Sequence, residues 1–292
     1  MAATKGRLEA ALERVRQRRL DAHGATNPRA APTAPGPAPT VPPQTAAARQ
    51  SAILAMPRFS HVDYDRKKCM AARVLIADGE EGRPANAAGA AAYRMLRTRI
   101  LQRTRSNRWN TIGVTSPAPG DGKSLTALNL ALAIAREGNS NVFLIDLDMR
   151  SPKMCQYLGA IPPVEIIDYF TGDAPPQDVL FSIGVDNLTL AGTLTRTDQA
   201  SELLATGRVE ELFEYIRGVA PEPLIIVDLP PLLSTDDAII IAPKVDACLL
   251  VLSEGKSRRD GAAKALELLS DFKLAGIILN RSKTIVSDYY SS

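Results

Sequence analysis

The chain has 292 residues, of which 45% are hydrophobic and 23% are charged, and its formal net charge is +3. These values are typical of a globular protein that can bury a sizeable core. No apolar run approaches the roughly 18 residues that a membrane-spanning helix requires, and the amino terminus lacks the apolar segment of a signal peptide. We therefore expect a cytoplasmic protein without a transmembrane segment.

Cysteine and histidine contents exclude several kinds of chemistry. Cys69, Cys155 and Cys248 lie far apart and form no CxxC pair, which argues against a zinc site and against a disulfide framework. The two histidines, His23 and His61, both precede the domain that carries the motifs below. Histidine-based catalysis is therefore not expected.

The amino-terminal arm has its own composition. Residues 1–60 carry nine Lys/Arg and three Asp/Glu, a net of +6, which leaves −3 for the rest of the chain. Apolar residues at helical spacing predict a basic amphipathic helix within residues 1–24, and seven of the 21 prolines predict a Pro/Ala-rich linker over 25–50. Residues 51–86 are interpreted as a connecting segment. The arm could bind an anionic lipid surface or an acidic partner, or be a solvated extension, and the sequence leaves these alternatives open.

From residue 87 onward, short apolar runs alternate with helical patterns. The candidate strands are Thr111–Thr115, Val142–Leu147, Leu188–Ala191, Leu224–Leu229, Cys248–Leu252 and Gly276–Leu279. The candidate helices are Ala90–Arg105, Ser124–Glu137, Gln199–Arg217, Thr235–Ala242 and Arg258–Phe272. Strands that are apolar on both faces predict an α/β fold with a mostly parallel sheet between helices. Ligands bind at the carboxyl ends of such strands.

A phosphate-binding loop follows the first of these strands. The segment 115–124, TSPAPGDGKS, lies between that strand and a helix. Gly120 and Gly122 allow the backbone to wrap closely around phosphates, and the helix amino terminus faces them. Lys123 would contact the β- and γ-phosphates of a nucleotide, and the hydroxyl of Ser124 would bind Mg²⁺.

Carboxylates end two of the other strands. Asp146 and Asp148 follow an apolar run, and Asp228 ends a second run that Pro230 and Pro231 terminate. Each carboxylate alone could be a helix cap or a surface charge. Beside a phosphate-binding loop, however, they favour a Mg²⁺ site for a triphosphate.

These three segments resemble, in order and spacing, the Walker A, A′ and B motifs of bacterial tyrosine kinases. Pro117 departs from the generic GxxxxGK[ST] pattern, which has glycine there. The segment 191–204 and the basic amino-terminal helix resemble the cytoplasmic autokinases of exosortase-linked exopolysaccharide systems. The resemblance spans about residues 87–284 and implies a P-loop NTPase fold of the MinD/ParA-like type, with a disordered amino-terminal extension.

The resemblance implies roles for particular residues. Lys123, Asp146, Asp148 and Asp228 would be catalytic, with Asp148 helping to deprotonate the acceptor phenol. Mg²⁺ would be held by Ser124, Asp146 and Asp228. The predicted ATP-binding residues are Pro119, Gly120, Asp121, Gly122, Lys123, Ser124, Leu125 and, at the adenine, Asn280. The predicted phosphoacceptors are Tyr289 and Tyr290, in a carboxyl-terminal tail that comprises residues 285–292.

The implied function is an ATP- and Mg²⁺-dependent tyrosine autokinase that regulates exopolysaccharide polymerisation and export. Its implied partners are a membrane polysaccharide co-polymerase, which would recruit it to the inner face of the membrane, and a phosphotyrosine phosphatase. Further copies of the chain are also expected as partners, and nucleic acid is not. Ring-forming relatives carry an E-x-x-R-x-x-R motif, of which this chain has Arg94 and Arg97 but Ala91 in place of the glutamate.

Two other functions fit the same fold. The first is a switch ATPase of the ParA/MinD type, but those proteins carry an additional lysine that Ser116–Pro119 lacks. The second is an ATP-binding regulator that docks a membrane partner without transferring phosphate. The absent glutamate and the small number of tail tyrosines favour the regulator, whereas the complete set of motif residues favours the kinase.

Overall fold

The computed structural model describes residues 57–77 and 84–282. The predicted amino-terminal helix, the linker and the tail with Tyr289 and Tyr290 lie outside the described residues. No described helix is both long enough and apolar enough to cross a membrane.

One sheet organises the described part of the chain. Its strand order is β1-β4-β5-β3-β6-β2-β7-β8, and every neighbouring pair is parallel except β4 with β5. The strands are β1 (Ser60–His61), β2 (Thr111–Thr115), β3 (Val142–Asp146), β4 (Phe181–Ser182), β5 (Leu188–Ala191), β6 (Leu224–Asp228), β7 (Ala247–Ser253) and β8 (Leu274–Asn280). The expected mostly parallel α/β sheet is confirmed.

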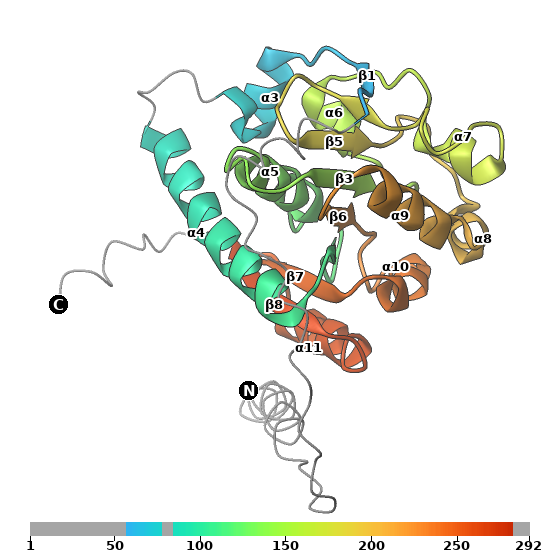
Figure 1. Ribbon diagram of the computed structural model, residues 1–292. Coiled ribbons are helices and arrows are strands. Elements are labelled where there is room, and N and C mark those ends of the chain that lie inside the picture. Colours follow the sequence, from blue (N-terminus) through green and yellow to red (C-terminus); the bar gives the residue numbers. More distant parts are fainter. Residues whose placement is uncertain (1–56, 78–83, 283–292) are drawn as a thin grey trace, which may run out of the picture.

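Helices cover both faces of this sheet, as Figure 1 shows. One face packs against α3 (Arg66–Ala72), η1 (Leu75–Ala77), α4 (Pro84–Asn107), α5 (Lys123–Ala135) and α6 (Met154–Leu158). The other face packs against α7 (Ile166–Thr171), α8 (Ala200–Ala205), α9 (Arg208–Val219), α10 (Asp237–Ile241), η2 (Ala242–Lys244) and α11 (Arg259–Leu268). The fold therefore has three layers, with the sheet in the middle.

Strand β3 shows why the sheet is buried on both sides. Val142 and Leu144 point into the core beneath α5, whereas Phe143 and Ile145 point into the core on the opposite face. Successive side chains of a strand alternate between faces, so a strand that is apolar throughout requires a hydrophobic layer on each side.

The structure differs from the predicted elements in three places. The helix expected over Gln199–Arg217 is divided into α8 and α9 by Thr206 and Gly207, so its prediction as one helix was wrong. Short elements that the sequence pattern did not reveal are β1, β4, α3, α6 and α7. Because β1 pairs with β4, part of the segment interpreted as a connection belongs to the sheet.

Candidate functional site

The candidate site lies where β2, β3 and β6 end side by side. β6 stands between β2 and β3, and Asp146 of β3 is the register partner of Asp228 of β6. The P-loop continues from the end of β2 and leads into α5, which begins at Lys123. The order of the strands therefore places the Walker A, A′ and B residues at one edge of the sheet.

Glycines shape the P-loop. Gly120 and Gly122 have φ angles of 78° and 98°, in the left-handed region that side chains disfavour. Gly122 is the residue before α5, and no side chain caps the helix there. The first amide groups of α5 have no partner within the helix, and the helix dipole makes this end electropositive. The loop is thus suited to an anionic ligand.

Lys123 lies among the strand-end carboxylates. Its Nζ is 2.6 Å from Oδ2 of Asp148, 3.2 Å from Oδ1 of Asp228 and 3.1 Å from Oγ of Ser124. Lys123, Asp148 and Asp228 are all buried. The structure therefore places Lys123 in contact with two of the three aspartates that the motifs predicted to act with it.

Asp146 is held differently from Asp148 and Asp228. Its side chain accepts hydrogen bonds from the backbone amides of Asp148, Lys153 and Met154 at 3.1–3.3 Å. It therefore fixes the turn after β3, and so the position of Asp148. Gly192 of the neighbouring loop packs closely against this turn, since a Cβ atom there would lie 2.5 Å from Cε of Met154 and would displace that side chain.

One ammonium group cannot balance three buried carboxylates. Burial, together with the negative charge of Asp228, raises the pKa of Asp146 to about 8. Burial also raises the pKa of Asp228, although Lys123 and Ser124 oppose this shift. Burial lowers the pKa of Lys123, but the charges of Asp228, Asp148 and Asp146 outweigh it and the net shift is upward. Lys123 is therefore charged at neutral pH, and burial favours the protonated form of Asp146.

The site is compatible with Mg²⁺. Oδ2 of Asp228 is buried and has no hydrogen-bond partner in the described part of the chain, so it is an oxygen that a cation could satisfy. Within residues 57–77 and 84–282, no group of three or more His, Cys, Asp or Glu side chains could hold a metal by itself. Mg²⁺ usually binds one or two carboxylates together with phosphates and water, so the residues present fit.

The remaining predicted nucleotide-binding residues line the same loop. Pro119 and Gly120 are exposed at its mouth, and Asp121 is buried with Oδ2 accepting from the amide of Ala118 at 3.3 Å. Leu125 is half-buried in the first turn of α5. Asn280, predicted to contact adenine, donates from Nδ2 to the carbonyl of Asp121 at 3.0 Å.

Two contacts to the loop were not predicted. Lys256, in the loop after β7, donates to the carbonyl of Pro119 at 2.9 Å, and Arg281, after β8, donates to the carbonyl of Gly120 at 3.1 Å. Lys256 follows β7, which lies beside β2 in the sheet, and Arg281 follows β8, which lies beside β7. Their position at the carboxyl ends of parallel strands was the signal that could have indicated them.

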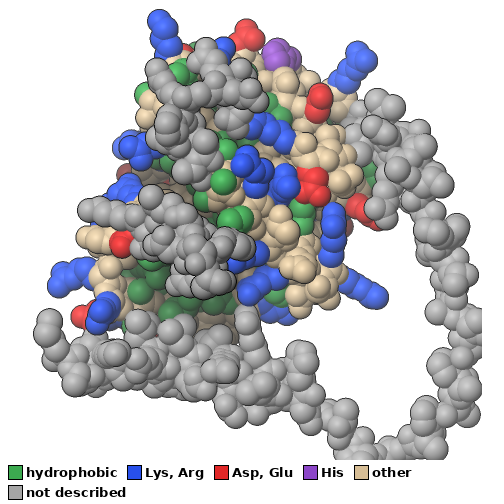
Figure 2. Space-filling model, turned by 90° about the vertical axis from the view of Figure 1, so that its left-hand side faces the viewer, with side chains coloured by type: hydrophobic (Ala, Val, Ile, Leu, Met, Phe, Trp, Pro, Cys, Tyr) green, Lys and Arg blue, Asp and Glu red, His purple; other side chains and the backbone are tan. Residues whose placement is uncertain are grey.

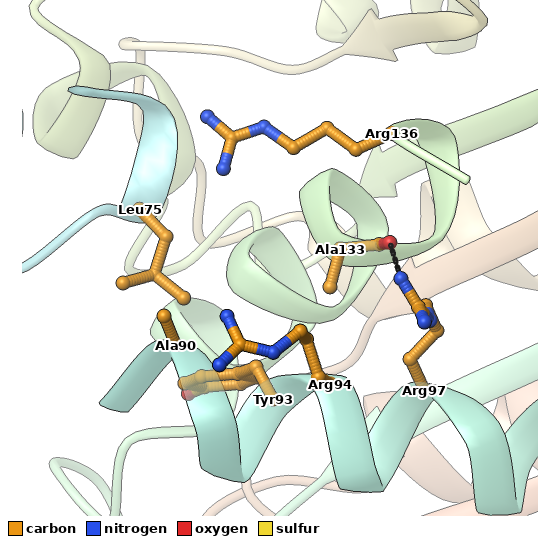
Figure 3. A pocket seen from close by; sticks show the side chains of 7 residues that line it. All are labelled: Leu75, Ala90, Tyr93, Arg94, Arg97, Ala133 and Arg136. Atoms are coloured by element: carbon orange, nitrogen blue, oxygen red, sulfur yellow. Dashed lines mark hydrogen bonds between the residues drawn. The ribbon is translucent and has the colours of Figure 1, made fainter. Parts of the chain in front are cut away.

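The two arginines of the E-x-x-R-x-x-R position lie away from the P-loop. Arg94 and Arg97 line a cavity of about 160 Å³ between α4, η1 and the end of α5, together with Leu75, Ala90, Tyr93, Ala133 and Arg136 (Figure 3). Nη1 of Arg97 donates to the carbonyl of Ala133, and its Nε is 3.1 Å from the carboxylate of Glu137. Figure 2 shows that Lys and Arg side chains outnumber acidic ones on the face of the molecule that carries α4.

Comparison with known proteins decides the family. The chain is 31% identical over 193 residues to tyrosine-protein kinase YwqD of Bacillus subtilis, covering 65% of this chain and 80% of that protein. It is 30% identical over 200 residues to tyrosine-protein kinase CpsD of Streptococcus agalactiae, covering 68% of this chain and 85% of that protein. The chain belongs to the bacterial tyrosine-protein kinase family. The family and the enzyme class implied by the Walker motifs are thereby confirmed.

Longer relatives and solved structures agree with this assignment. The putative tyrosine-protein kinase EpsB of Ralstonia nicotianae is 30% identical over 191 residues, and the chain spans a quarter of its length. The BceF tyrosine kinase domain superposes with a TM-score of 0.61 at 25% identity, covering 81% of this chain and 97% of that one.

A likeness in fold alone extends to MinD. The Pyrococcus horikoshii MinD complexed with Mg-ADP gives a TM-score of 0.51 at 21% identity, covering 60% of this chain and 72% of that one. The expected P-loop fold of the MinD/ParA-like type is therefore confirmed. No protein-family model matches the chain.

Proposed function

We propose that this bacterial tyrosine kinase transfers the γ-phosphoryl group of Mg-ATP to Tyr289 and Tyr290 of its own tail. The observation that carries the proposal is the cluster in which Lys123 contacts Asp148 and Asp228 beside the P-loop. Phosphoryl transfer depends mainly on positioning and charge stabilisation, and such a cluster supplies both.

The predicted residues divide the binding of Mg-ATP between them. The P-loop amides and Lys123 would bind the phosphates, and Asn280 would lie at the adenine. Ser124, Asp146 and Asp228 would hold Mg²⁺, directly or through water. When bound, the metal neutralises charge on the phosphate oxygens as the bond to the leaving group breaks.

Asp148 is the residue proposed to assist the acceptor. It would take the proton from the tyrosine hydroxyl while the phenol oxygen bonds to the γ-phosphorus and the bond to the β-phosphate oxygen breaks, which leaves ADP and phosphotyrosine. Its carboxylate is held by the amide of Ser151 on one oxygen and by Lys123 on the other. Such a fixed orientation supports a role in positioning the proton transfer.

The tail can reach a kinase site by length alone. Tyr289 lies nine positions after Asn280, which corresponds to at most about 30 Å when the chain is extended. Either the site of the same chain or that of a neighbouring copy is compatible with this span.

The proposed biological role is regulation of exopolysaccharide polymerisation and export. The tyrosine kinases CpsD and EpsB are among the relatives that support it. A membrane polysaccharide co-polymerase would be the activating partner and would bring the kinase to the inner face of the membrane. Further copies of the chain and a phosphotyrosine phosphatase complete the proposed set of partners.

Intact-mass measurement after incubation with Mg-ATP tests this function. The parent protein should gain one or two phosphates, and the variant Tyr289→Phe/Tyr290→Phe should gain none. A parent that binds or hydrolyses ATP without gaining mass, in the presence of its membrane partner, would instead indicate a switch ATPase or a regulator.

The variant Lys123→Met tests the contribution of the nucleotide site. It removes the cation that contacts the strand-end carboxylates and should abolish both ATP binding and tyrosine phosphorylation. Undiminished phosphotyrosine in this variant would rule out the proposed mechanism.

A further inference from the structure

Three side chains from one side of the sheet hold three consecutive carbonyl groups of the P-loop. Lys256 Nζ donates to Pro119 O at 2.9 Å, Arg281 Nη2 to Gly120 O at 3.1 Å, and Asn280 Nδ2 to Asp121 O at 3.0 Å. We call Lys256, Asn280 and Arg281 the carbonyl clamp.

The carbonyl clamp explains why glycine is required beneath it. A Cβ atom on Gly120 would lie 2.3 Å from Nζ of Lys256, and one on Gly122 would lie 2.1 Å from Nδ2 of Asn280. A side chain at either glycine would therefore displace a clamp residue, in addition to straining the backbone.

The loop that carries Lys256 is itself bonded to Asn280. The amide of Glu254, in the same loop as Lys256, donates to the carbonyl of Asn280 at 2.9 Å. The carbonyls of residues 119–121 accept bonds from this assembly, whereas the amides that begin α5 are left for an anionic ligand. The clamp and a bound phosphate thus use opposite polar groups of the same loop.

Arg281 also stands shortly before the tail. Its φ angle is 58°, unusual for a residue with a side chain, and its amide donates to Oδ1 of Asn280 at 2.8 Å. Its guanidinium group donates to the P-loop, and Arg281 lies four residues before residue 285, where the tail begins. The chain is therefore bonded to the P-loop at Arg281, shortly before the tail.

We propose that Lys256 and Arg281 are positioning residues of the kinase: they hold the P-loop in its phosphate-binding shape and, through Arg281, make the start of the tail respond to nucleotide. The response of the tail rests on the proposed autokinase function. Binding energies are reciprocal, so if nucleotide stabilises the clamp, the clamp must tighten nucleotide binding by the same factor.

Nucleotide affinity is the first test, and it needs no phosphoryl transfer. Lys256→Met and Arg281→Asn should each raise the Kd for Mg-ADP about tenfold, as expected for loss of a charged hydrogen bond. Asn is chosen at 281 because it tolerates a positive φ angle. Lys264→Met, which removes an exposed lysine from α11, is the matched control and should leave the Kd unchanged. A Kd within twofold of the parent in both clamp variants would overturn the proposal.

Hydrogen exchange at Arg281 and Ser282 is the second test. In the parent, saturating Mg-ADP should slow hydrogen exchange of these amides. In Arg281→Asn, saturating Mg-ADP should leave their exchange rates unchanged. Equal protection in the parent and in the variant would contradict the link to the tail.

Phosphorylation at saturating ATP separates positioning from folding. Arg281→Asn should then slow phosphorylation of its own tail several-fold more than phosphorylation of an added tyrosine peptide, and the control Lys264→Met should phosphorylate both at the parental rate. Equal loss for both acceptors would contradict the link between Arg281 and the tail. The affinity and exchange tests use ADP and need no phosphoryl transfer. They therefore test the carbonyl clamp even if the proposal of autophosphorylation proves wrong.

Discussion

Arg150 fixes the segment that follows the Walker A′ aspartates. Its Nε and Nη2 contact the two carboxylate oxygens of Asp237 at 2.7 and 3.3 Å, and Nη2 also donates to Ser201 at 2.9 Å. Asp237 is fully buried at the start of α10. A bidentate arginine–carboxylate pair fixes both the distance and the orientation of the two side chains. It therefore holds the loop after β3 against α8 and α10.

This ion pair gives a pH-dependent contribution to stability. Burial alone would raise the pKa of Asp237, but hydrogen bonds from Arg150 and Ser201 outweigh burial and the net pKa is lowered. A carboxylate with a lowered pKa stabilises the fold fully above its unfolded pKa of about 4, and this stabilisation is lost as pH falls through the folded pKa.

We expect Asp237→Asn to lower the free energy of unfolding by about 2–3 kcal/mol at pH 7, because it leaves Arg150 without its charge partner. Urea denaturation at a series of pH values measures this. The difference from the parent should shrink as pH falls below about 4. Asp236→Asn, at the exposed neighbouring position, is the control. A difference that is constant with pH would show that the charge of Asp237 does not contribute.

Helix α3 illustrates how a short element is stabilised locally. Asp65 precedes it, and Oδ1 accepts from the amides of Lys67 and Lys68 at 2.8 and 3.1 Å. The amide of Asp65 in turn donates to the carbonyl of Leu158 at the end of α6. The cap therefore both starts α3 and fixes it against α6.

Removal of this cap should cost about 1 kcal/mol of unfolding free energy, the usual value for an aspartate N-cap. Asp65→Ala is the variant. Asp63→Ala is the control, because the fully exposed carboxylate of Asp63 caps no described helix and lies 3.4 Å from Nε2 of His61. Urea denaturation of both variants measures the effect. Equal stabilities would mean that tertiary packing alone determines α3.

Long, regular elements were predictable and short ones were not. β2 and β5 have the bounds that their apolar runs indicated, because buried strands of a parallel sheet are continuous apolar segments. β1 and β4 have two residues each, too few to show any periodicity, and they exist because of pairing across the sheet. The break between α8 and α9 was missed because apolar spacing continues across Gly207.

The candidate site was partly predictable for a related reason. The motif residues could be predicted because each lies in a short contiguous segment with a recognisable pattern. They are Lys123, Asp146, Asp148 and Asp228. Contacts such as that of Lys256 with the P-loop depend on β7 lying next to β2, and strand order cannot be read from a local pattern.

On the scale of the folded protein, nucleotide binding should appear as a change in global stability. A ligand at 100 times its Kd stabilises the native state by about 2.7 kcal/mol, or roughly 5–10 °C in Tm for a domain of this size. We expect such a shift with Mg-ATP for the parent and none for Lys123→Met. Thermal unfolding monitored by circular dichroism, with and without nucleotide, measures it. A shift of equal size in both proteins would place the nucleotide elsewhere.

All three cysteines of the chain are buried and free. Burial raises the pKa of Cys69 to about 11 and that of Cys248 to about 12, and it also raises the pKa of Cys155. Only thiolates react readily with maleimides, so the native thiols are inert at neutral pH. A fluorophore attached at an added cysteine such as Ser287→Cys should therefore label the tail selectively in the otherwise native sequence, and its emission would follow the tail in real time.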